Sequence, residues 1–136
     1  MGRIISAYIM PHPPILVPEV GRGEEKKAIK TFNSFERASS DISREKPHTI
    51  ILTTPHGPVF QDYIHISVTD RLKGNLGRFG AGKVNFDYEN DLELVKKIIK
   101  KAYDARVPCG GVSDEIARKY RLERELDHGA MVPLYF

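Results

Sequence analysis

The sequence predicts an α/β fold with a mostly parallel sheet and helices on both faces of that sheet. Short apolar runs at residues 3–10, 48–54 and 131–136 are typical of buried strands. Two longer segments, residues 24–43 and 90–105, repeat apolar side chains at three- and four-residue steps, as amphipathic helices do. Because strands and helices alternate along the chain, we expect the strands to run parallel with the helices packed against the sheet.

The first half of the chain contains the two predicted strands that precede histidines. Residues 3–10 end at a group of prolines, which favours an extended loop after the strand. The helix at residues 24–43 carries acidic side chains in its first turn, where they complement the helix dipole. After the second strand, residues 63–69 alternate apolar and polar side chains and predict a half-exposed strand.

The second half is expected to contain a loop followed by short elements. Residues 71–82 contain four glycines and predict an irregular, mobile loop. The elements expected after it are a strand at 84–88, a helix from Asn90 or Asp91 to about residue 105, a strand at 106–109, a helix from Ser113 to Tyr120 and a strand at 131–136. Because no repeat, linker or low-complexity tract divides the chain, residues 1–136 are expected to form a single α/β domain.

The charge pattern argues against nucleic acid as a partner. The net charge is only +3, with 21 Lys and Arg against 18 Asp and Glu, although the sequence pI is about 9.0. Acidic and basic residues alternate within the same short runs, as at residues 24–27, 44–46 and 121–125. Mixed runs of this kind form solvated faces rather than basic patches. Nucleic-acid binding, which would weaken steeply with salt, is therefore the least favoured function.

Composition also predicts the compartment. With 40% hydrophobic and 29% charged residues, the chain is an ordinary globular sequence. Its single cysteine, Cys109, excludes an internal disulfide and suits a reducing compartment. The sequence has no secretory signal pattern and no apolar run long enough to cross a membrane. We therefore expect a cytoplasmic protein with no membrane partner.

Two histidines stand beside prolines directly after predicted buried strands. His12 lies between prolines after the first strand, and His56 lies in a Pro-His-Gly-Pro loop after the second. Neighbouring prolines restrict the backbone and pre-orient the side chain, and neutral imidazole is a common ligand of Fe, Zn and Cu. Either histidine alone is most simply an ordinary loop residue. Two in equivalent positions predict a metal site, with both imidazoles at one edge of a parallel sheet.

A third histidine stands before the last predicted strand. Asp127, His128 and Gly129 are consecutive, and the simplest interpretation is a turn in which Asp and Gly serve the turn geometry. An acid beside a histidine also suits a site in which neighbouring groups orient the imidazole. His48, at a strand entry, and His65, within an alternating strand, are interpreted as structural, and a third ligand among them is left open.

In this order, the motifs resemble those of the class III extradiol ring-cleavage dioxygenases. Three motifs occur in the same order as in the catalytic B subunit of that family. They are a predicted strand followed by His12 between prolines, a predicted strand followed by Pro-His56-Gly-Pro, and a later Leu-Asp-His128-Gly. The similarity spans essentially the whole chain. It looks closest to the branch associated with the AmmeMemoRadiSam system, which includes the Memo proteins.

The resemblance implies a non-haem Fe(II) held by two histidines and a carboxylate, with open positions for an aromatic substrate and O₂. His12 and His56 match the family's histidine ligands. His128 matches a catalytic histidine that lines the substrate and O₂ pocket without ligating the metal. Zn(II) is the alternative metal. The family's Glu ligand and catalytic base lie further along than this chain runs, so we expect the N-terminal part of a longer domain.

Two functions from different classes follow. The leading one is a metal-dependent oxidoreductase that acts on an aromatic diol and O₂; the alternative is a non-catalytic, Memo-like module that binds a metal or ligand with a partner protein. Glu19, Asp62 and Glu89 are interpreted as solvated loop residues, so two imidazoles alone predict weak metal binding. An apolar strand at 131–136 would need partner strands, either from a longer protein or from a second copy in a homo-oligomer.

Overall fold

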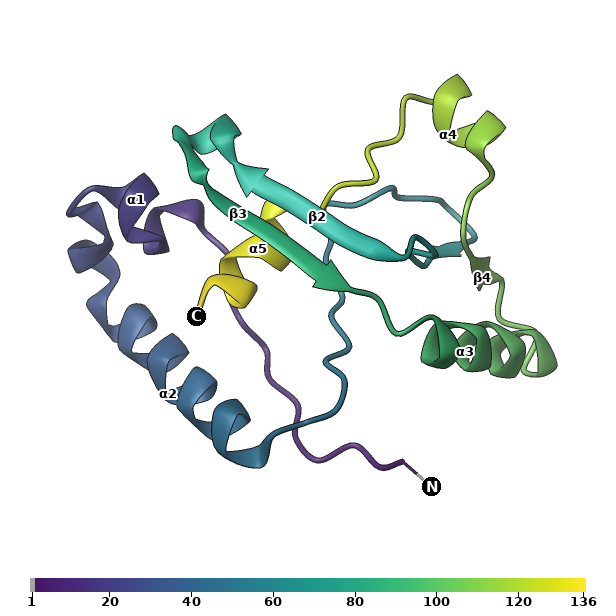
Figure 1. Ribbon diagram of the computed structural model, residues 1–136, viewed down its shortest axis with the longest axis horizontal. Helices are drawn as coiled ribbons and strands as arrows, with labels where there is room; N and C mark the ends of the chain where they lie inside the picture. The colour runs from purple at the N-terminus through teal and green to yellow at the C-terminus, as the bar shows by residue number, and fades with distance from the viewer. Residues whose placement is uncertain (1) are drawn as a thin grey trace. The chain divides into compact units, whose positions relative to one another are not determined.

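The computed structural model describes residues 2–136, which form two compact units built from interleaved segments (Figure 1). Among the described residues, the first unit contains 2–54, 75–84 and 128–136, and the second contains 55–74 and 85–127. The chain mixes helices and strands and includes a parallel strand pair, which confirms the α/β class. That residues 1–136 form one domain stays a prediction.

Helices make most of the regular structure of the first unit. After the 3₁₀ turn η1 (Pro14–Leu16) and α1 (Pro18–Gly21), the chain enters η2 (Glu24–Ala28) and α2 (Ile29–Glu45). The helix predicted at residues 24–43 is therefore confirmed, although its first turn is 3₁₀ helix. It ends where Lys46 adopts the left-handed conformation, with φ 49°, and its amide donates to the Ile42 carbonyl.

The end of the chain in the first unit is a helix, α5 (His128–Tyr135), and the strand predicted at 131–136 is wrong. Residues 129–132 are all buried, so this helix shows no polar face that would reveal its period. After it, the ring of Phe136 packs against Phe32 and Phe35 of α2, with centroids 5.1 and 4.8 Å apart. Because Phe35 is only 2% exposed, this aromatic contact belongs to the core of the unit.

The second unit contains the parallel pair and two capped helices. Strand β1 (Ile64–His65) pairs with β4 (Cys109–Gly110), each shorter than the strand predicted there. Helix α3 (Leu92–Asp104) begins at Asp91, whose side chain accepts from the Leu94 amide. Helix α4 (Asp114–Lys119) begins at Ser113, which accepts from the Ile116 amide. In each cap a side-chain oxygen satisfies an amide that would otherwise be unpaired. Both helices therefore begin where the sequence predicted.

A β-hairpin occupies the region predicted as an irregular loop, so that prediction is wrong. Strands β2 (Arg71–Leu76) and β3 (Ala81–Glu89) pair and run in opposite directions, joined through the 3₁₀ turn η3 (Gly77–Phe79) (Figure 1). Cross-strand charges support the pairing, because Arg71 Nε lies 2.7 Å from Asp87 Oδ1. The glycine at position 80 supplies a turn with φ 80° rather than mobility.

Residues 3–10 and 48–54 are not strands, contrary to the prediction. Within residues 2–136 neither segment belongs to a sheet. Their isoleucines are largely in solvent: Ile4 is 85% exposed, Ile9 104% and Ile51 63%. An apolar run becomes a buried strand only when neighbouring strands and a covering layer accept it, and the described residues do not supply them.

None of the helices in residues 2–136 combines the length and the apolar character needed to cross a membrane.

Candidate metal centre

His12 is held by the proline-rich segment and the buried residues after it. The Leu16 amide donates to the Pro13 carbonyl at 3.0 Å, which closes the η1 turn directly after the histidine. Leu16 and Val17 are 0% exposed and anchor this turn in the core. His12 itself is half-buried. The prolines restrict the backbone and the buried pair fixes its position, so the imidazole has a stable base.

His128 is the first residue of α5, and its ring meets that of His12 within the first unit. The two ring centroids are 5.6 Å apart, with an interplanar angle of 58°. Two imidazoles bound to one ion at about 2.1 Å would have centroids roughly 5–5.5 Å apart. The observed pair is therefore close to the spacing of two ligands of one metal ion. The sequence predicted that His128 precedes a strand. In the structure it begins a helix instead.

A phenylalanine that the sequence analysis did not select completes this group of rings. Phe79, in the turn of the β2–β3 hairpin, has its ring centroid 5.4 Å from that of His128, in a T-shaped arrangement of 65°. The local sequence offers only an aromatic residue between glycines, a pattern that does not reveal a contact with residue 128. Only the folded hairpin places Phe79 at the candidate site.

His56 belongs to the second unit, where it is exposed in the loop after Pro55. Its neighbour Gly57 lies beside Asp127 of the same unit: a β-carbon added at Gly57 would stand 3.7 Å from Asp127 Oδ2. That His56 shares a metal site with His12 stays a prediction.

The other two histidines have different surroundings. His65 is half-buried on β1, and burial, together with the positive charge of Arg124, lowers its pKa below 6.5. The same guanidinium would repel a metal ion, so His65 is a poor ligand. His48 is exposed after α2, and the strand at whose entry it was predicted does not form. The structural roles of both histidines stay predictions.

One of the three acids considered as solvated loop residues is in fact bonded. Glu19 lies in α1 and its Oε2 accepts a hydrogen bond from the Tyr135 hydroxyl at 2.8 Å. Burial and this carboxylate raise the pKa of Tyr135 to about 12. Asp62 and Glu89 are exposed, as predicted. Glu19 therefore ties α1 to the helix that begins at His128.

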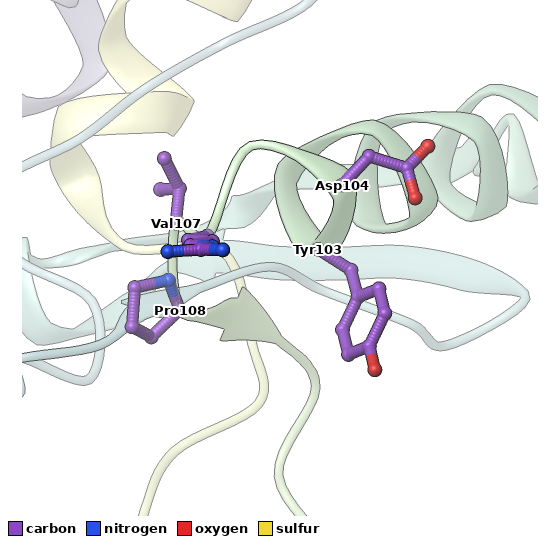
Figure 2. A pocket seen from close by; sticks show the side chains of 5 residues that line it. Tyr103, Asp104, Val107 and Pro108 are labelled. Carbon is purple, nitrogen blue, oxygen red and sulfur yellow. The ribbon is translucent and has the colours of Figure 1, made fainter.

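Two surface hollows accompany these features, one in each unit. In the first unit a hollow of about 370 Å³ lies between residues 8–11 and α2, and so adjoins His12 through Pro11. In the second unit a hollow of about 510 Å³ lies at the end of α3, lined by Tyr103, Asp104, Arg106, Val107 and Pro108 (Figure 2). None of the predicted site residues lines the second hollow, so its size does not make it the functional site.

The comparisons with known proteins identify the family. The chain belongs to the family described as the catalytic LigB subunit of aromatic ring-opening dioxygenase, whose model matches residues 6–136. This confirms the resemblance to the extradiol ring-cleavage dioxygenases, while the assignment to the Memo-like branch stays a prediction.

Two curated relatives match only with part of their length. Protein CA_C1420 of Clostridium acetobutylicum is 48% identical over 129 residues, which are 95% of this chain and 28% of that protein. The 2-aminophenol 1,6-dioxygenase beta subunit of a Pseudomonas species is 35% identical over 101 residues, 65% of this chain and 32% of that subunit. The chain thus spans less than one third of either relative. No solved structure matches it.

Proposed function

We propose that the protein is a non-haem metal-dependent oxidoreductase that joins O₂ to an aromatic diol and opens the ring, as extradiol dioxygenases do. The observation that carries the proposal is the pairing of His12 with His128 within a chain of the aromatic ring-opening dioxygenase family. A relative named for a 2-aminophenol substrate supports an aromatic substrate with two adjacent polar groups. We place this activity in the cytoplasm, in keeping with a single unpaired cysteine.

The donor set proposed for the metal consists of His12 and His56 as ligands, with His128 beside His12. Imidazole nitrogens suit Fe(II) and Zn(II), and we favour Fe(II) because the proposed reaction uses O₂. When bound, the iron would supply Lewis acidity and electron transfer between substrate and O₂. The restrained backbone at His12 and the buried helix behind His128 would hold these side chains before the metal arrives.

We propose His56 as the second ligand on the strength of its sequence motif. Its Pro-His-Gly-Pro segment matches a histidine ligand motif of the family, and the chain belongs to that family over residues 6–136.

His128 is proposed as a hydrogen-bond donor rather than as a ligand of the metal. Its ring lies beside His12 but starts a helix whose next four residues are buried, so it is carried by a rigid element. An imidazole N–H placed beside a bound oxygen stabilises negative charge that develops there during the reaction. In the proposed mechanism His12 and His56 would hold the metal, and His128 would donate a hydrogen bond to the reacting oxygen.

An anaerobic titration with Fe(II), followed by O₂ uptake with catechol and with 2-aminophenol, tests this function. We expect about one iron per chain, and oxygen consumption that requires both iron and the aromatic compound. A protein that consumes O₂ at the same rate without metal, or that binds iron equally well after His12→Ala, would contradict the proposal.

A second candidate is a non-catalytic, Memo-like module that binds a metal or ligand together with a partner protein. It is favoured by the exposed apolar side chains of residues 3–10 and 48–54, since exposed isoleucines often mark surfaces that another polypeptide covers. Iron at one per chain after anaerobic purification would favour the enzyme. A stable fold without metal and without oxygen consumption would favour the module. For either function, enzyme or binding module, we propose that residues 1–136 form one domain.

A further inference from the structure

The turn of the β2–β3 hairpin is a well-defined structure, which we call the Phe79 turn and define as residues 77–80. The Gly80 amide donates to the Gly77 carbonyl at 3.0 Å, and the Gly77 amide donates to Asn75 Oδ1 at 2.8 Å. Gly80 takes a φ of 80°, which a residue with a side chain adopts only with strain. The backbone around Phe79 is therefore held by its own hydrogen bonds.

The Phe79 turn is also held to the rest of the first unit. Leu76, just before it, is 0% exposed, and Ala81, just after it, is 7% exposed. Arg22, at the end of α1, donates from Nη2 to the Gly80 carbonyl at 3.2 Å. Two buried flanks and a hydrogen bond to the tip leave the turn little freedom to move, so the position of Phe79 is set by the core.

From this fixed turn, Phe79 touches the candidate site. Its ring lies at 5.4 Å and 65° from that of His128, which in turn lies at 5.6 Å and 58° from that of His12. His128 thus has an aromatic ring and an imidazole as ring neighbours in the first unit. Edge-to-face contacts of this kind select one orientation of a ring, because rotation about its χ2 would lose the favourable geometry.

We propose that Phe79 is a positioning residue that holds the His128 imidazole in its working orientation beside His12. The proposal rests on the proposed function, in which the His128 N–H donates to a reacting oxygen. A donor held a few tenths of an ångström from its ideal place loses much of its value, because its hydrogen bond weakens with angle and distance. Phe79 is 37% exposed, so one part of its ring contacts His128 while another part faces solvent.

The test compares Phe79→Leu with Phe79→Tyr in the iron-loaded protein and in the metal-free protein. Leu keeps an apolar side chain but removes the ring, whereas Tyr keeps the ring. In the iron-loaded protein we expect Phe79→Leu to lower kcat for catechol on the order of tenfold, with bound iron unchanged, as for other residues that orient site groups. Phe79→Tyr should stay within about twofold of wild type, because the edge-to-face contact survives.

The metal-free protein gives a readout that does not depend on activity. Nuclear magnetic resonance should show Overhauser contacts between the ring protons of residue 79 and His128 in the wild type and in Phe79→Tyr. In Phe79→Leu the His128 ring should populate more than one χ2 orientation. Unchanged His128 signals together with unchanged kcat in Phe79→Leu would overturn the proposal.

A matched control separates positioning from general loss of stability. Phe86, in β3, is 6% exposed and contacts Tyr88 rather than His128. Phe86→Leu should lower the melting temperature while the His128 conformation and kcat stay as in wild type. If Phe79→Leu fails to fold, Arg22→Ala provides the second variant, since it removes the hydrogen bond to Gly80 and should disorder the His128 ring more mildly.

The outcomes also distinguish this proposal from the proposed function. A wild-type protein that binds no iron and consumes no oxygen would reject the enzyme, while the His128 conformation in the metal-free variants still decides whether Phe79 positions the ring. An active wild type whose His128 conformation is the same in Phe79→Leu and in Arg22→Ala would reject the positioning role and leave the enzyme intact.

Discussion

His128 and His65 are both half-buried histidines beside a phenylalanine, yet their surroundings suit opposite purposes. The His128 ring is 5.4 Å from Phe79 and 5.6 Å from His12, while the His65 ring is 6.4 Å from Phe60. The imidazole beside His128 is that of His12, which we propose as a metal ligand. The charged neighbour of His65 is Arg124, a cation that opposes both protonation and metal binding.

The backbone positions of these histidines also differ. His65 lies inside a parallel strand pair, opposite Gly110, where its own backbone is part of the ladder. His12 and His128 lie at the ends of elements, just before η1 and at the start of α5. Element ends leave a side chain free to meet residues from elsewhere in the chain, so similar burial alone does not indicate a functional histidine.

The largest expected difference is in metal affinity, between a variant of the candidate site, at His12, and a variant of the parallel strand pair, at His65. We expect His12→Ala to weaken Fe(II) binding by more than about 100-fold, since loss of a ligand should exceed the effect of losing an outer partner. His65→Ala should change the affinity by less than about twofold. Competition titration with a chelating dye measures both. Equal losses in the two variants would break the distinction between a metal-site histidine and a structural one.

The next prediction concerns the different roles of His12 and His128 within the site. His128→Asn should lower kcat roughly 100-fold, as the loss of a donor to a developing oxyanion does. Bound iron should remain near one per chain, in contrast to His12→Ala. Metal analysis beside steady-state oxygen uptake makes the comparison. Loss of iron in His128→Asn as complete as in His12→Ala would show that His128 is a ligand.

A smaller effect is expected from the support of the helix that carries His128. Tyr135→Phe removes the hydrogen bond to Glu19 and should lower the free energy of unfolding by about 1 kcal/mol. Because the folded-state pKa of about 12 is above the ordinary value of 10, this contribution is present below pH 10 and is lost as the pH rises through 12. Urea denaturation at pH 8 and pH 11 measures it. From pH 8 to pH 11 the wild type should lose more unfolding free energy than Tyr135→Phe does. Equal losses in the two proteins would contradict the prediction.

The smallest expected effect is the pH dependence that His65 contributes. Its folded-state pKa is below the ordinary 6.5, so the unfolded chain binds the proton more tightly. The wild type should therefore lose stability as the pH falls below about 6.5, until the folded-state pKa is passed. His65→Gln should show a weaker decline between pH 7.5 and pH 5.5 in denaturation midpoints. An identical decline in the two proteins would mean that other groups cause it.

The sequence by itself determined features that depend on neighbouring residues. Asp91 and Ser113 cap their helices as predicted, because a side chain and an amide three residues away meet through local geometry. The period of residues 24–43 revealed α2, since one face of that helix is buried and the other is not. The order of the three histidine motifs was enough to predict the family, which the match over residues 6–136 confirms.

Tertiary structure alone decided the features that depend on partners far along the chain. The apolar run at 131–136 lies in a helix up to Tyr135, with Met131 and Val132 buried, and residues 3–10 lack the neighbours that would make them a strand. The glycines of the Phe79 turn belong to a hairpin instead of a mobile loop because Leu76 and Ala81, on either side of the turn, are buried in the core. The Arg71–Asp87 pair adds to the strand pairing. The contacts of His128 with His12 and Phe79 join three distant segments, and only packing, not local propensity, brings such segments together.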